Sequence, residues 1–147
     1  MAVVVRDIDK AVEYYQSLGI PSPEPGWIHD SSTYIDYKVY GKTPGTIDKT
    51  KMRYAQVGSF KIEFVQPVKG KPIYKEFLDS EGEGVHHLAF WVDDIDEEAA
   101  KLEKIGIPCI TSVKLSPDDK HCPNGCFAYF DTRKVGNVLI ELMMLPK

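Results

Sequence analysis

Hydrophobic positions along the chain follow one pattern that occurs twice. Two short apolar runs of strand length, 2–5 and 88–92, each lead to an aspartate and then to apolar residues at helical spacing. These apolar positions are Ile8, Ala11, Val12, Tyr15 and Leu18 in the first copy, and Ile95, Ala99, Leu102 and Ile105 in the second. The pattern predicts a strand followed by an amphipathic helix in each copy.

The ends of both helices carry the expected signals. Asp7 and Asp94 stand at the N-cap positions, and Glu97, three residues after Asp94, predicts a capping box. Gly19 and Gly106 stand where a left-handed C-cap would end each helix. Each helix is therefore expected to stop just before its glycine.

The strand-to-helix segments of the two copies align without a gap. The segment from Val5 to Gly19 recurs from Val92 to Gly106, at an offset of 87 (92 minus 5, and 106 minus 19). Segments of strand composition follow each helix, at 34–40, 52–57 and 61–66 in the first copy and at 109–114, 127–130 and 138–143 in the second. An internal duplication explains this repetition.

The duplication predicts an α+β fold built from paired βαβββ modules. We expect one domain over 1–147, with module one at 1–67, a short linker helix within 68–84 and module two at 85–147. The linker segment has apolar residues at helical spacing and ends at Gly82. The surface of each sheet that its helix does not cover would line a cleft between the modules.

Composition excludes several classes of protein. The 147 residues have a net charge of -4 and no cluster of Lys and Arg, so a nucleic-acid partner is not expected. No apolar run approaches the roughly 20 residues of a membrane helix. The 3 cysteines are a poor basis for a disulfide framework. The cytoplasm is the expected location.

Two glutamates and a histidine are the candidate chemical groups. Glu63 and Glu141 lie within strands between large apolar residues, so they face away from those neighbours. A buried carboxylate needs a partner, and His87 in the strand that opens module two can supply an imidazole. Glu63, His87 and Glu141 would suit one divalent ion: Co, Ni, Zn, Mn or Fe. Solvated glutamates and a half-buried strand histidine are the alternative interpretation.

A second candidate metal site is weaker. His121, Cys122 and Cys126 lie close together, but structural zinc sites usually need four ligands. The simpler interpretation is a Pro-Asn-Gly turn before the strand at 127–130, with Cys126 serving as a small apolar residue.

Nearly the whole chain resembles the vicinal oxygen chelate superfamily, which includes glyoxalase I, extradiol dioxygenases, bleomycin-resistance proteins and methylmalonyl-CoA epimerase. The resemblance rests on the two repeated helix starts, on the strands around Glu63 and Glu141, and on the strings 82–90, 92–95 and 136–142. These strings look most like methylmalonyl-CoA epimerase. The resemblance implies paired βαβββ modules, a divalent metal bound by Glu63, His87 and Glu141, and a homodimer.

The resemblance also implies a reaction. In the epimerase branch a proton alpha to a thioester carbonyl is removed and returned, and Glu141 is the first candidate for the catalytic base. The substrate would be a small molecule, an acyl-CoA or another thioester or thiol adduct. A glyoxalase I-type isomerase, related to lactoylglutathione lyase, and a non-catalytic binding module of the bleomycin-resistance kind are the alternatives.

One ligand of the superfamily has no counterpart in the chain. The remaining ligand, usually His, would fall at 87 minus 87, one residue before Met1. We expect that a segment precedes the sequence; otherwise three protein ligands suffice and water or substrate completes the site. The second acid or base is not assigned among the candidate carboxylates, which are Glu24, Asp30, Asp36 and Asp48.

Overall fold

The computed structural model describes residues 1–146, and contacts divide the chain into two compact units. Unit 1 comprises Met1–Asp30 and Thr46–His86, and unit 2 comprises Ser31–Gly45 and His87–Lys147. The helices are α1 (Ile8–Ser17), α2 (Ile73–Ser80) and α3 (Ile95–Lys104). The strands are β1 (Ala2–Val4), β2 (Trp27–Asp30), β3 (Tyr34–Val39), β4 (Lys49–Val57), β5 (Phe60–Lys69), β6 (Gly84–Trp91), β7 (Cys109–Leu115), β8 (Cys126–Phe130) and β9 (Leu139–Met144).

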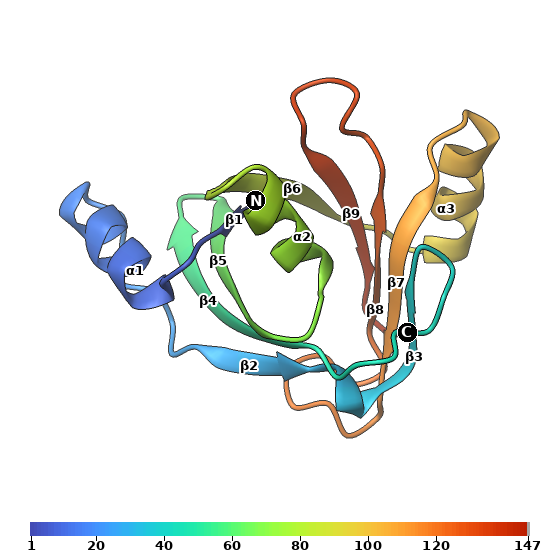
Figure 1. Cartoon of the computed structure of the whole chain (residues 1–147), viewed down its shortest axis with the longest axis horizontal. Helices are drawn as coiled ribbons and strands as arrows, with labels where there is room; N and C mark the ends of the chain where they lie inside the picture. The colour runs from blue at the N-terminus through green and yellow to red at the C-terminus, as the bar shows by residue number, and fades with distance from the viewer. Residues whose placement is uncertain (147) are drawn as a thin grey trace. The chain divides into compact units, whose positions relative to one another are not determined.

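The sheet of unit 1 has the order β2-β4-β5-β1. Strand β4 pairs antiparallel with β2 and β5, and β1 pairs parallel with β5. On one face, Ile8 and Val12 of α1 pack in a buried cluster that includes Val3, Ile62 and Phe64. Helix α2 contacts β1 and β5 (Figure 1). Two helices, α1 and α2, therefore pack against this sheet.

The sheet of unit 2 has the order β6-β9-β8-β7-β3. Only the β6–β9 pairing among these strands is parallel. Ile95 of α3 packs in a buried cluster with Ala128, Phe130 and Leu142, so α3 covers one face of this sheet (Figure 1). Apart from β3 in unit 2, each unit thus repeats the same order of strand, helix and antiparallel strands, and the strand before the helix pairs parallel with the last strand.

The α+β class and the duplicated arrangement are confirmed. Two strands differ from the sequence expectation. The segment of β3 is expected among the strands of module one, but it pairs with β7 in unit 2. Strand β2, which pairs with β4, was not predicted at all. Both differences lie in residues 21–50, where hydrophobic periodicity is weak and pairing depends on strands distant in sequence.

The predicted helix ends are present. The Asp7 side chain accepts hydrogen bonds from the N–H groups of Asp9 and Lys10, and the N–H of Lys10 lowers the pKa of the Asp7 carboxyl. Asp94 caps α3 in the same way. Gly19 and Gly106 have φ values of +91° and +82°, a backbone conformation that residues with a Cβ rarely adopt.

Three details of the helices depart from expectation. Leu18 and Ile105, expected on the buried faces, are 62% and 71% exposed because each lies beyond the last helical residue. The Glu97 carboxylate lies 2.9 Å from Nζ of Lys101, the partner one helical turn along. Glu97 therefore forms an ion pair along α3 in place of the expected capping-box contact.

Replacing Asp94 by Ala is expected to lower the free energy of unfolding by about 1 kcal/mol, because two backbone N–H groups of α3 lose their acceptor. Urea denaturation measures the change. Asp93→Ala is the matched control, since Asp93 is an exposed neighbour outside the cap. Equal losses in the two variants would contradict the capping role.

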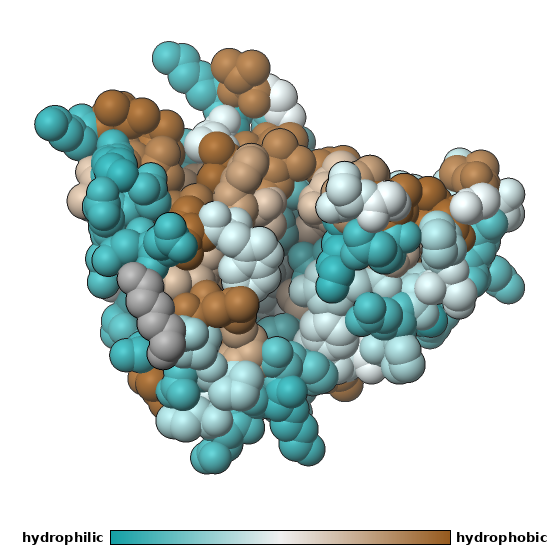
Figure 2. Space-filling view, turned by 180° about the vertical axis from the view of Figure 1, so that it is seen from behind, coloured by the Kyte–Doolittle hydropathy of each residue, from teal (hydrophilic) through white to brown (hydrophobic). Residues whose placement is uncertain are grey.

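Exposed apolar side chains interrupt the polar surface, as the brown areas of Figure 2 show. Leu88 and Phe90 of β6 are 42% and 50% exposed although they alternate with buried or half-buried residues. Within residues 1–146, none of the helices combines the length and the hydropathy that crossing a membrane requires.

Candidate active site

Glu141 faces away from α3 because of strand alternation in β9. Its neighbours Ile140 and Leu142 belong to the apolar cluster around α3. The Glu141 side chain lies on the opposite face of the sheet, and the residue is only 6% exposed. A carboxylate so deeply buried needs a polar or charged partner.

His87 supplies such a partner. The parallel register of β6 and β9 places Ala89 opposite Glu141, and His87 precedes Ala89 by two residues on the same face. The His87 imidazole is fully buried, and its Nε2 atom lies 3.1 Å from Oε2 of Glu141. Two of the three candidate residues are therefore in contact within unit 2.

Tyr129 lies next to the His87–Glu141 pair. It lies opposite Glu141 in the antiparallel register of β8 and β9, and it is 2% exposed. The ring centroids of Tyr129 and His87 are 5.0 Å apart in an edge-on arrangement, which restrains the imidazole orientation. Sequence reasoning missed Tyr129, because only the register between β8 and β9 identifies it.

Unit 1 contains a related arrangement around Glu63. In the registers of β5, Glu63 lies opposite Tyr54 of β4 and Ala2 of β1. Glu63 is 8% exposed, and its neighbours Ile62 and Phe64 pack against α1 on the other face. Each unit thus places a glutamate between a tyrosine and an alanine on the face away from its repeated helix.

The strand registers of the two units also agree with the repeat offset. Ala2 and Ala89 differ by the repeat offset of 87, and each pairs with the glutamate of its own unit. The pairings in the two units support the offset that the sequence predicts.

The buried His87–Glu141 pair provides two possible donors for a divalent ion. An imidazole nitrogen and a carboxylate in buried contact are suitable donors for a transition metal. Within residues 1–146, no set of three or more His, Cys, Asp or Glu side chains is arranged to hold a metal ion. Glu63 belongs to unit 1 and the His87–Glu141 pair to unit 2, so the three-ligand set stays a prediction.

The cysteine segment is consistent with the simpler interpretation of its sequence. Cys122 and Cys126 are free thiols, and burial raises the pKa of both. Cys126 packs against the apolar cluster of α3, as expected of a small apolar residue. Burial thus favours the neutral thiol at both cysteines, whereas metal binding requires the thiolate.

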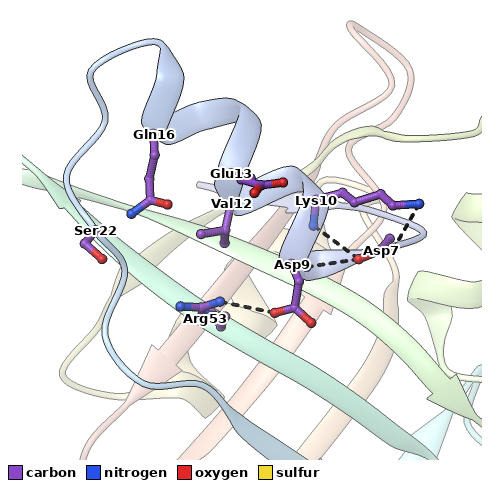
Figure 3. A pocket seen from close by; sticks show the side chains of 8 residues that line it. All are labelled: Asp7, Asp9, Lys10, Val12, Glu13, Gln16, Ser22 and Arg53. Carbon is purple, nitrogen blue, oxygen red and sulfur yellow. Dashed lines mark hydrogen bonds and ion pairs between the residues drawn. The ribbon is translucent and has the colours of Figure 1, made fainter.

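A surface pocket of about 470 Å³ lies in unit 1, between α1 and β4 (Figure 3). Its polar lining is largely self-paired: Nη1 of Arg53 lies 3.3 Å from Oδ1 of Asp9, and Lys10 contacts Asp7. Glu63 does not line this pocket. The candidate catalytic groups are therefore separate from it.

Comparison with known families identifies the fold. Residues 1–130 match the sequence profile of the Glyoxalase/Bleomycin resistance protein/Dioxygenase superfamily. The chain belongs to this superfamily. The superfamily includes enzymes such as epimerases and dioxygenases, and it generally uses divalent metal ions.

Individual proteins are similar to the chain over different lengths. An uncharacterized protein of Bacillus subtilis, YqjC, is 28% identical over 100 residues, which is 66% of this chain and 68% of that protein. A hypothetical protein of Bacillus halodurans has a similar structure, with a TM-score of 0.68 and 20% identity over 99% of this chain and 91% of that one. Methylmalonyl-CoA epimerase from Mycobacterium tuberculosis has a TM-score of 0.60 and 20% identity over 99% of this chain and 85% of that one. At these identities the structural likeness shows the fold.

Proposed function

We propose that the protein is a metal-dependent epimerase that moves the proton alpha to a thioester carbonyl, as expected of a methylmalonyl-CoA epimerase. The observation that carries this proposal is the buried contact of 3.1 Å between His87 and Glu141. Membership of the superfamily and the fold shared with an epimerase support it.

Glu141 would remove and return the proton. A carboxylate within a buried site can act as a general base when the carbon acid lies within hydrogen-bond distance. His87 contacts this carboxylate, and Tyr129 lies opposite Glu141 in the register of β8 and β9, so both would restrain its position before a substrate binds. Little reorganisation is then needed at the proton-transfer step.

The ligand set in this proposal is Glu63, His87 and Glu141. Both glutamates are buried, and each lies on the sheet face away from its repeated helix. When bound, a divalent ion would supply electrostatic stabilisation for the charge that develops on the thioester oxygen. The acyl-CoA substrate, the homodimer and the cytoplasmic location stay predictions.

The test combines metal content with proton exchange. We expect the purified protein to bind Co, Ni, Zn, Mn or Fe, and to exchange the alpha proton of methylmalonyl-CoA for deuterium in D₂O. Elemental analysis measures the first and mass spectrometry of the thioester the second. Full metal occupancy without exchange would contradict the epimerase and favour the glyoxalase I-type isomerase. Absence of bound metal after loading with each ion would favour the binding module.

A further inference from the structure

Thr111 of β7 contains a buried hydroxyl that the proposed reaction does not use. The residue is 4% exposed, and its Oγ1 atom has no hydrogen-bond partner among residues 1–146. A buried hydroxyl without a partner destabilises a fold. Valine has nearly the same shape and suits a strand equally well, so strand packing alone does not explain a hydroxyl here.

The hydroxyl lies in the same cross-strand row as the candidate base. Thr111 is opposite Tyr129 in the register of β7 and β8, and Tyr129 is opposite Glu141 in the register of β8 and β9. Directly opposed residues project from the same face of a sheet. All three side chains therefore lie on the face of unit 2 away from α3.

The length of this row, from Thr111 to Glu141, is that of a small ligand. Neighbouring strands are about 4.8 Å apart, so the backbones at Thr111 and Glu141 are roughly 10 Å apart. An acyl group whose reacting carbon is near Glu141 would span about this distance to reach Thr111. Thr111 and Glu141 are 4% and 6% exposed, so both polar groups are shielded from bulk water.

We propose that the Thr111 hydroxyl donates a hydrogen bond to a carboxylate or carbonyl oxygen of the bound acyl group. Such a group offers only acceptor oxygens at that end, so the hydroxyl must act as the donor. Thr111 is then a residue that determines specificity for acyl groups with a second oxygen-bearing substituent. This role rests on the proposed function only for the placement of the reacting carbon beside Glu141.

The main variant is Thr111→Val, with Thr111→Ser as the conservative variant. We expect Val to raise the KM for methylmalonyl-CoA and the Kd for free methylmalonate about tenfold, with a smaller effect on kcat. Ser should restore most of the affinity. The Tm of the Val variant should equal or exceed that of the native protein, because no protein hydrogen bond is lost.

Ser112→Ala is the matched control. Ser112 lies next to Thr111 on β7, but it is opposite Ala128, which belongs to the α3 cluster, so it projects from the other face. The control should leave both affinities unchanged. A drop in the Tm of Thr111→Val with unchanged affinities would mean that the hydroxyl is structural, and it would overturn the proposal.

The two probes separate this inference from the proposed function. If native protein exchanges the proton of methylmalonyl-CoA and the Val variant binds both probes equally well, the role of Thr111 is wrong and the epimerase stands. If native protein binds methylmalonate without catalysing exchange, and Val weakens that binding, the epimerase is wrong and the role of Thr111 stands. If native protein binds neither probe, both proposals are wrong.

Discussion

Glu141→Gln should reduce alpha-proton exchange by about 100- to 10,000-fold, the range expected when a general base is removed. Gln occupies nearly the same volume but has no negative charge and cannot accept the proton. The His87 imidazole, which lies 3.1 Å from the native carboxylate, would face an uncharged amide. Exchange of methylmalonyl-CoA in D₂O measures the loss, and circular dichroism and the Tm report on the fold.

Glu97→Gln provides the matched control for this variant. It removes the same charge from an exposed position on α3, where the Glu97 side chain is 66% exposed and contacts Lys101. This control should retain native exchange. Exchange by Glu141→Gln within tenfold of native would show that another group is the base. A collapse of its Tm would show that Glu141 stabilises the fold.

Local patterns in the sequence were enough to predict which way Glu141 points. Alternation of Ile140, Glu141 and Leu142 requires the glutamate to face away from its apolar neighbours, and the repeat showed that a helix covers the apolar side. The same reasoning applies to Glu63 in unit 1. These features depend only on residues close together in the chain.

Features that depend on strand register could not be predicted in the same way. Tyr129 and Thr111 reach the row of Glu141 only because β7, β8 and β9 pair in one particular register. A shift of one residue would turn both side chains to the other face. The sequence contains no local signal for this strand register. The register depends on hydrophobic packing of the whole sheet against α3.

The pairing of β3 with β7 is a further example. Strand β3 precedes β4 in the chain by a short interval, yet it joins the sheet of unit 2. The repeat assigned this segment to the first copy because sequence order was the only guide. Which sheet such a segment joins depends on which strand edge is free to pair with it. Strand edges exist only in the folded sheet.

The largest expected effect on stability comes from Phe64→Ala, which should lower the free energy of unfolding by about 3–5 kcal/mol. Phe64 is fully buried on the face of β5 that packs against α1, and its ring lies 5.0 Å from the ring of Tyr15. Removing the ring leaves a cavity that the helix and sheet can fill only in part. Urea denaturation at constant temperature measures the change.

Phe60→Ala tests whether burial is the cause. Phe60 lies on the same face of β5 but is 50% exposed, so its loss should amount to about 1 kcal/mol or less. Phe64→Leu keeps most of the volume and should lose less than about 1.5 kcal/mol, which keeps the measurement possible if the Ala variant is largely unfolded. Similar losses for Phe60→Ala and Phe64→Ala would mean that α1 does not rest on this face. Strand alternation would then no longer place Glu63 on the face away from α1, because that orientation depends on Phe64 being held on the helix side.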